Sequence, residues 1–231
     1  MNWKNVTPFA IIATVLAVIN LIVLVVLICL LPDTVPIHFN VDMVVDRMGS
    51  PAWLVVFGIL PVLIALGLIL ELVLRKREYQ NRRVMQIFMS LLAVFFAWFG
   101  WVFYGIVSCG AEMGEKVSVS MSLLIMLPLG LILIVFGNYL PKIRRNRTLG
   151  LKLPWTLKNE ECWNKTHRFS GYVTIIAGAI LSIGAIICGV LDIDVYSFIF
   201  LGVAILLFII APTIYSAVIY KKIAATENNN S

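Results

Sequence analysis

Long apolar runs alternate with short polar segments along the whole chain. Six such runs stand out, at residues 8–31, 52–74, 84–107, 119–140, 171–191 and 196–220. Each is long enough to cross a bilayer, because a helix rises about 1.5 Å per residue and needs about 20 apolar residues to span the hydrocarbon. We therefore expect an all-α polytopic membrane protein, a six-transmembrane-helix bundle. The first run is too long for the apolar part of a signal peptide and lacks a small-residue cleavage site, which indicates a retained helix.

The composition excludes a water-soluble fold. Of the 231 residues, 61% are hydrophobic and only 13% are charged. Such a chain lacks the polar side chains that a water-facing surface requires. Because the six runs take up most of the chain, no separate soluble domain fits beside them.

The distribution of positive charge predicts the orientation of the chain. Sixteen of the 18 Lys and Arg residues fall on one side of a six-span arrangement, and only Arg47 and Lys116 fall on the other. Lys and Arg accumulate in cytoplasmic loops, so we expect both termini in the cytoplasm. The net charge of +6 follows from this arrangement and indicates no direct contact with nucleic acid.

The loop between the first two runs, residues 32–51, has the pattern of an extended strand. Apolar and polar residues alternate across 37–42, which is the period of a strand with one apolar face. Asp46, Gly49 and Ser50 are typical of a turn, and we expect that turn just before the second helix.

Three interpretations of this outer loop stay open. His38, Asn40, Asp42 and Asp46 form an acidic lip that would attract a cationic or amphipathic peptide. His38 with Asp42 and Asp46 is a weak metal pattern, since one His and two carboxylates at this spacing suit a helix better than a strand. An ordinary solvated loop is the third interpretation. We assign no metal and no cofactor.

The segment between the fourth and fifth runs is unusually polar. Residues 137–171 carry eight of the 18 Lys and Arg residues, two Trp and one of the two His. Asn159 is a good N-cap, and the two Glu residues after it suit the positive end of a helix, so we expect a helix to begin there. Along that helix, Glu160, Trp163 and His167 share one face. Trp155 and Trp163 are expected to anchor the segment at the lipid headgroups.

Three functions of this inner segment compete. The arginines satisfy the positive-inside rule by themselves. Clustered guanidinium groups also bind phosphate or anionic lipid. The mixture of aromatic and Arg side chains suits the docking of a cytoplasmic protein.

Prolines and cysteines add two smaller expectations. Pro61, Pro128 and Pro212 each lie inside an even-numbered run, where they either kink the helix or reflect the general frequency of proline in membrane helices. The four cysteines show no metal or redox spacing. They are small buried residues, or Cys29 and Cys109 form a disulfide.

The inner segment resembles the SdpI family of bacterial membrane proteins. The matching residues are Gly137, Asn138, Leu140, Pro141, Lys142, Gly150, Pro154, Trp155, Thr156, Leu157, Asn159, Glu160, Glu161, Trp163, His167 and Arg168. The outer loop is similar to the short N-terminal domain of longer family members at Leu31, Pro32, Pro36, His38, Phe39, Asn40, Asp46, Gly49 and Ser50. Two departures stand out: Met43 replaces a glycine that usually follows the Asn, and Lys152-Leu153 replaces the commoner Arg-Thr.

The resemblance implies a function at the bacterial cell membrane. Family members of this kind protect the producing cell from a secreted, membrane-active toxin peptide. The founding member also signals, holding a cytoplasmic DNA-binding autorepressor at the membrane. The resemblance divides the chain into an N-terminal domain, 1–83, and an SdpI-like domain, 84–231, whose cytoplasmic loop spans 138–170. The signalling candidates in that loop are Asn138, Pro141, Gly150, Pro154, Trp155, Thr156, Asn159, Glu160, Glu161, Trp163, His167 and Arg168.

The alternative function is that of a membrane enzyme or transporter acting on a lipid or small solute. Catalysis calls for a nucleophile beside a base, whereas His38 and His167 are isolated on opposite sides of the membrane. Transport favours ionisable groups near the midplane, and the apolar runs contain few. We therefore expect a protein that is not an enzyme and assign no catalytic residue.

Overall fold

The computed structural model describes residues 8–40, 42–74 and 81–229, with side chains at all of them except Phe9 and 227–229. It forms two compact units, Met1–Ser120 and Met121–Ser231. Six helices among the described residues are long and apolar enough to cross a membrane, at Ala10–Ile28, Pro51–Leu74, Arg82–Val107, Ser122–Lys142, Glu160–Val190 and Asp194–Thr226. The predicted six-span, all-α class is confirmed. Lys4 and the basic residues 75–77 are among the sixteen Lys and Arg residues expected on the cytoplasmic side, and they lie outside the described residues.

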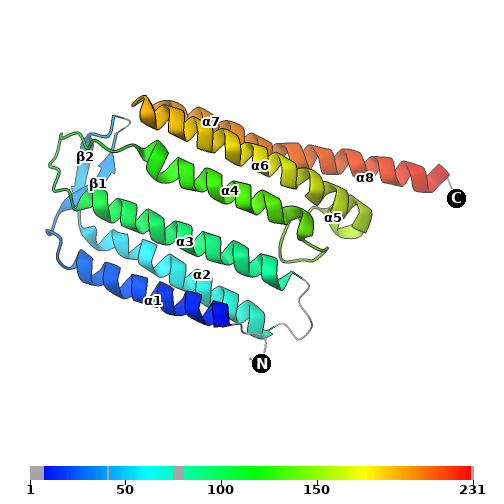
Figure 1. Ribbon diagram of the computed structural model, residues 1–231, viewed down its shortest axis with the longest axis horizontal. Coiled ribbons are helices and arrows are strands. Elements are labelled where there is room, and N and C mark those ends of the chain that lie inside the picture. Colours follow the sequence, from blue (N-terminus) through cyan, green and yellow to red (C-terminus); the bar gives the residue numbers. More distant parts are fainter. Residues whose placement is uncertain (1–7, 41, 75–80, 230–231) are drawn as a thin grey trace. The chain divides into compact units, whose positions relative to one another are not determined.

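Unit 1 consists of three antiparallel helices that carry a small β-hairpin at one end (Figure 1). The helices are α1 (Pro8–Ile28), α2 (Val55–Leu74) and α3 (Arg82–Val107), and the hairpin consists of β1 (Val35–Phe39) and β2 (Val45–Gly49). A short 3-10 turn, η2 (Pro51–Leu54), leads into α2. Leu24, Ile28, Val35, Leu54 and Val107 form a buried cluster that ties the hairpin to the helix ends.

The hairpin corrects one sequence-based expectation. The predicted strand exists as β1, but Asp46 and Gly49 lie in a second strand paired to it, not in a turn before the second helix. The turn comes earlier because the Asn40 side-chain oxygen accepts hydrogen bonds from the backbone N–H groups of Asp42 and Val44, each at 3.0 Å. Met43 then takes φ 60°, which explains why a glycine suits this position.

Unit 2 surrounds one long helix. α4 (Leu127–Tyr139) follows a π-helical segment, η3 (Ser122–Met126), and ends in the 3-10 turn η4 (Leu140–Lys142). The short α5 (Pro154–Lys158) precedes α6 (Glu160–Val190), which is 31 residues long. After η5 (Asp194–Tyr196) the last span consists of α7 (Ser197–Ile205), a second π segment η6 (Leu206–Ile210) and α8 (Ala211–Asn229).

Glycines allow α4 and α6 to pack backbone against backbone. Gly137 faces Gly171, and Gly130 faces Gly178, so two glycines seven residues apart on each helix meet in antiparallel register. A Cβ added at Gly137 would lie 2.7 Å from the Gly171 carbonyl oxygen, and one added at Gly178 would lie 2.5 Å from the Gly130 oxygen. Close approach of this kind is how helices associate where lipid removes the hydrophobic driving force.

Two of the three predicted proline sites coincide with π-helical segments. Pro128 lies in the first turn of α4, directly after η3, and Pro212 lies in the first turn of α8, directly after η6. A proline N–H is missing and its ring crowds the carbonyl four residues earlier, so a locally widened turn before it relieves the clash. Pro61 lies within α2.

The packing units divide after Ser120, which places α3 with α1 and α2. The sequence-based division after residue 83 concerned family segments and stays a prediction. The cysteines are all free: Cys162 and Cys188 are buried, whereas Cys29 and Cys109 are exposed and unlinked.

Candidate functional site

The inner segment forms a folded cap at the start of α6. Asn159 has the extended backbone of an N-cap, and its side-chain oxygen accepts a hydrogen bond from the Cys162 N–H at 2.9 Å. Glu160 and Glu161 occupy the first turn, where negative charge complements the helix dipole. The predicted helix start is confirmed. The helix then continues without a break into the fifth span.

Trp163 and His167 form the centre of this cap. Both side chains are fully buried, and their rings stack with centroids 4.0 Å apart and 19° between the planes. The Trp163 Nε1–H donates to the Ile143 carbonyl oxygen at 2.8 Å. The expectation that Trp163 anchors at the headgroups is therefore wrong, because the loop 143–153 covers it. Glu160 is exposed and does not share the buried face.

Both ring nitrogens of His167 have backbone partners. Nδ1 lies 2.9 Å from the Trp163 carbonyl oxygen, and Nε2 lies 3.1 Å from the Leu151 N–H. The tautomer that satisfies both is the neutral ring with its proton on Nδ1, so that Nε2 accepts from Leu151. A second proton, on Nε2, would place the ring N–H opposite the Leu151 N–H, so that two donors would face each other. This side chain thus fastens the loop to α6 and has no nitrogen left for chemistry.

Gly150 is the residue that lets the loop pass over the His167 ring. Its φ is +106°, which L residues rarely adopt, and an added Cβ would meet the His167 Nε2 and lie 3.2 Å from the Trp163 ring. Both conformation and space therefore require glycine here.

Thr156 closes the next turn. Its hydroxyl donates to the Leu151 carbonyl oxygen at 2.7 Å and accepts from the Leu153 N–H at 3.0 Å. Leu153 occupies the N-cap position of α5, and its side chain makes no capping hydrogen bond. The resemblance had pointed to Thr at 153, a residue type that would supply such a bond.

Two further contacts fasten the cap to its surroundings. The Trp155 Nε1–H donates to the Ser216 hydroxyl at 3.0 Å, which joins α5 to α8. The Arg145 guanidinium donates to the Lys158 carbonyl oxygen at 3.2 Å, at the end of α5. Sequence reasoning missed Ser216, because nothing in a lone Ser within an apolar run marks it as the partner of a distant Trp.

Asn146 was also missed, although its type carried a signal. Its side-chain oxygen accepts from the N–H groups of Thr148 and Leu149, each at 2.7 Å, and its amide donates to the Arg144 and Leu149 carbonyl oxygens. An Asn among basic residues is a typical turn former.

The predicted inner residues divide into internal and surface groups. Thr156, Trp163 and His167 are buried, and Gly150, Trp155 and Asn159 are partly buried. The exposed candidates are Asn138, Pro141, Pro154, Glu160, Glu161 and Arg168. The basic side chains of the segment are also all exposed, namely Lys142, Arg144, Arg145, Arg147, Lys152, Lys158, Lys165 and Arg168. The surface of the cap is therefore strongly cationic.

The predicted outer residues come together only in part. His38 Nδ1 lies 2.6 Å from an Asp46 carboxylate oxygen across the hairpin, and both side chains remain largely exposed. Asn40 uses its side-chain oxygen for the turn, and Asp42 is exposed. Within the described residues no three His, Cys, Asp or Glu side chains cluster closely enough to hold a metal.

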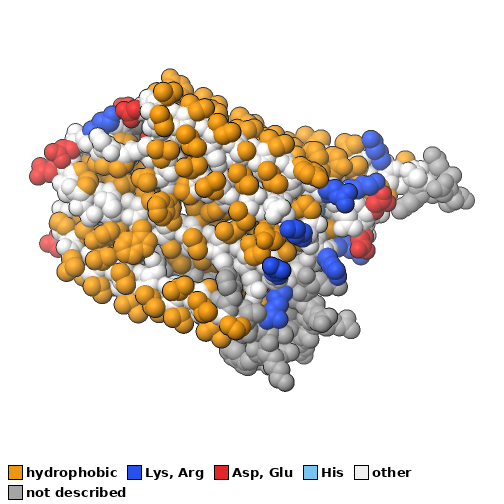
Figure 2. Space-filling model, in the orientation of Figure 1, with side chains coloured by type: hydrophobic (Ala, Val, Ile, Leu, Met, Phe, Trp, Pro, Cys, Tyr) orange, Lys and Arg blue, Asp and Glu red, His pale blue; other side chains and the backbone are white. Residues whose placement is uncertain are grey.

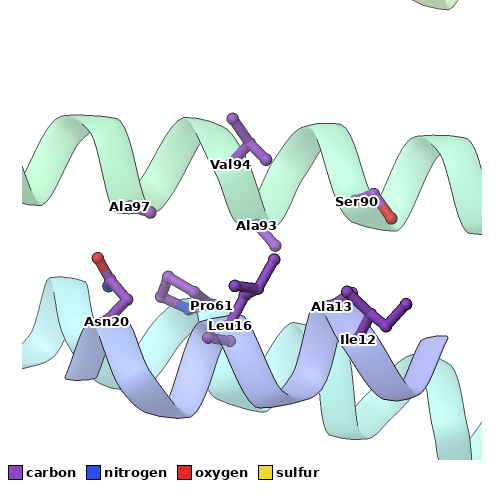
Figure 3. Close-up of a pocket in the computed structure, with 10 residues that line it drawn as sticks. Ile12, Ala13, Leu16, Asn20, Pro61, Ser90, Ala93, Val94 and Ala97 are labelled. Atoms are coloured by element: carbon purple, nitrogen blue, oxygen red, sulfur yellow. The ribbon is translucent and has the colours of Figure 1, made fainter. Parts of the chain in front are cut away.

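Unit 1 also contains an apolar crevice within the membrane span. It has a volume of about 250 Å³, and Figure 3 shows Ala13 of α1 on one side and Ala93 and Ala97 of α3 on the other. Ala17 of α1 and Pro61 of α2 also line it. Exposed apolar side chains form its rim, so it opens toward lipid.

Two polar side chains also line this crevice. The Asn20 oxygen accepts from the Trp101 Nε1–H at 2.8 Å, but its amide nitrogen and the Ser90 hydroxyl are covered and have no partner among the described residues. The pattern of small residues facing each other admits a lipid chain or side chain but specifies no chemistry.

Comparison with known proteins finds two separate regions of similarity, one in each unit. Residues 142–216 match the SdpI/YfhL protein family, and residues 15–65 match a domain of unknown function, DUF1648. About a third of the chain is therefore similar to the SdpI/YfhL family. The family match runs from the end of η4 to Ser216, so it contains residues 142–171 of the cap and both partners of the Trp155–Ser216 hydrogen bond.

A curated relative is similar to this chain over nearly its full length. The "Immunity protein SdpI" of Bacillus subtilis (strain 168) is 25% identical over 213 residues, which is 92% of this chain and 96% of the relative. No solved structure matches the chain.

Proposed function

We propose that this chain is an integral membrane immunity protein, which protects the cell from a secreted membrane-active peptide. The observation that carries the proposal is the similarity to an immunity protein over 92% of the chain. The similarity is not confined to the apolar helices, which any membrane protein would share, because the family match includes the polar cap. The hairpin and the cap give the protein one folded polar element in each unit.

The proposed orientation places both termini and the cap in the cytoplasm. In unit 2 the exposed Lys and Arg side chains gather around α5 and the start of α6, whereas Asp192 and Asp194 lie beyond the other end of α6 (Figure 2). In unit 1, Arg82 and Arg83 begin α3, and the hairpin lies at its opposite end. The positive-inside rule supports the same direction for both units.

We infer that the protein acts by binding and not as an enzyme. His167 spends both ring nitrogens on backbone groups, and His38 pairs with Asp46 on an open surface instead of beside a nucleophile. Neither arrangement supplies the buried acid–base pair that catalysis would use. The partner proposed on the outer face is a secreted peptide.

A second role proposed for the cap is to report inward. The exposed cationic surface around Arg168 would face anionic lipid headgroups, and the exposed Glu160 would be available to a cytoplasmic DNA-binding repressor. Glu161 is also exposed, but its carboxylate pairs with Lys165 at 2.6 Å. The buried Trp163 and His167 would hold that surface in shape without touching a partner.

Deleting the gene tests the proposed immunity. The deletion strain should become sensitive to culture supernatant from its own parent strain, and a plasmid copy should restore growth. Leu131→Ala, at an exposed apolar position on α4, is the matched control that should restore growth fully. Equal growth of the parent and deletion strains in that supernatant would contradict the immunity function.

A further inference from the structure

Unit 1 has a second hollow, at the outer end of its helices, which we call the outer cleft. Its volume is about 400 Å³, and it lies between the start of the hairpin and the loop that follows α3. The residues used below are Val35, Met48, Val107, Ala111, Glu112 and Met113. None of the four predicted peptide-binding residues of the hairpin lines it.

The floor of the outer cleft is rigid. Val35 and Val107 are each 2% exposed and belong to the buried cluster that joins β1 to the helix ends. The hairpin is held from its other side as well, because the Val45 N–H donates to the Glu115 carbonyl oxygen and the Gly114 N–H donates to the Val45 carbonyl oxygen, each at 2.9 Å. The cleft is therefore preformed, as small binding sites usually are.

The loop after α3 leaves the cleft open. Gly110 lines it with φ +74°, and a Cβ built on this residue would meet no atom within 4 Å. Met113 also lines the cleft, and 59% of its surface is exposed, so its apolar side chain is accessible to a ligand.

The electrostatics of the outer cleft favour a cation. α3 is 26 residues long, and its C-terminal end, which carries partial negative charge, reaches the cleft at Val107. Glu112 adds a full negative charge in the lining. The polar ends of unit 1, residues 29–54 and 108–120, hold five carboxylates and only two cations in total. An acidic cluster alone would not define a site, but here Glu112 belongs to the lining of a hollow whose wall also contains the apolar side chains of Val35, Met48 and Met113.

We propose that the outer cleft binds a basic, amphipathic segment of the secreted peptide. Its apolar side chains would pack on Val35, Met48 and Met113, while its Lys or Arg groups would face Glu112 and the end of α3. This inference rests on the proposed immunity function and names the site at which that function begins. A neutral lipid chain would satisfy the walls but not the charge.

A peptide-binding measurement tests the proposal. The full chain in phosphatidylcholine nanodiscs is titrated with a fluorescein-labelled amphipathic helical peptide of Leu, Ala and Lys, and then with the same peptide carrying Glu at each Lys. We expect the Lys peptide to bind about tenfold more tightly than the Glu peptide, after subtraction of binding to empty nanodiscs.

Variants then locate the binding. Ala111→Trp should fill the cleft and weaken binding about tenfold, and Glu112→Gln should weaken it about threefold to fivefold. Glu112→Gln leaves the backbone contact of Glu112 N–H to the Glu115 carboxylate in place, so it tests charge without unfolding the loop. Asp192→Asn makes the same charge change outside the cleft, and Leu131→Trp adds a Trp at a lipid-facing position. Each of these control variants should bind the Lys peptide within about twofold of the wild-type affinity.

Three results would overturn the proposal. The first is binding to the wild-type chain that does not exceed binding to empty nanodiscs. The second is binding by Ala111→Trp as tight as that of wild type, and the third is a greater loss of binding in Asp42→Asn than in Glu112→Gln. The last result would move the site to the His38–Asp46 face of the hairpin. In the growth test, full protection by Ala111→Trp and Glu112→Gln would reject the cleft while immunity stands, whereas a deletion strain without sensitivity would reject the immunity itself.

Discussion

The polar cap of unit 2 and the hairpin of unit 1 contain the chain's two histidines in opposite environments. His167 is buried, stacked on Trp163, and bonded at both nitrogens to backbone groups. His38 lies on the surface and has a single ion-pair contact with Asp46. Buried polar groups cost free energy when their partners are lost, whereas exposed ones regain water. We therefore expect the cap to respond to substitution far more strongly than the hairpin does.

The largest difference should appear between His167→Ala and His38→Ala. Removing the buried ring opens a cavity and leaves the Leu151 N–H without its acceptor, so we expect a loss of about 3 kcal/mol in the free energy of unfolding. His38→Ala removes an exposed pair and should cost about 0.5 kcal/mol or less. Thermal unfolding of both purified variants in detergent measures this, and equal melting temperatures would contradict the comparison.

Two glycines with positive φ provide the next test. Gly150→Ala combines an unfavourable φ with a collision against His167, and we expect a cost of about 2–3 kcal/mol. Gly110→Ala has an unfavourable φ but open space around it, and should cost about 1 kcal/mol. The same unfolding measurement distinguishes the two effects. A larger loss at Gly110 would show that the loop over His167 is not tightly held.

Two tryptophans compare a paired indole N–H with an unpaired one. Trp155→Phe removes the hydrogen bond to Ser216 and should cost about 1 kcal/mol. The Trp53 Nε1–H is buried without a partner among the described residues, so Trp53→Phe removes no hydrogen bond and should cost less. Urea or thermal unfolding followed by far-UV circular dichroism measures both changes. Rescue of Trp155→Phe by Ser216→Ala in the same background would identify the lost bond as the cause.

The smallest expected effect is a gain. Leu153→Thr supplies the missing side-chain cap at the start of α5 and should raise stability by about 0.5 kcal/mol. Leu153→Val, which is similar in shape to Thr but has no hydroxyl, is the matched control and should not gain. A lower melting temperature for Leu153→Thr than for Leu153→Val would show that the loss of apolar packing outweighs the cap.

Local features were accessible from the sequence because they depend on neighbours along the chain. The Asn159 cap needs only its own side chain and the two Glu residues after it, and the extended residues before Asn40 need only their alternation. The second strand was not foreseen, since the Asn40 turn that creates it competes with the turn signal of Gly49 and Ser50. Trp163 was assigned to the headgroups because sequence cannot show that the loop 143–153 folds back over it.

The sequence by itself determined the number of spans and the family resemblance, which both follow from runs of residue types in order. The orientation indicated by charge stays a prediction. Tertiary structure alone decided which polar residues of the cap are internal, how Gly130 and Gly137 meet Gly178 and Gly171, and where the outer cleft opens. The reason is that burial depends on segments distant in sequence that pack against each other. A Trp or His side chain makes surface contacts where it is exposed, and it holds neighbouring segments together where another segment buries it.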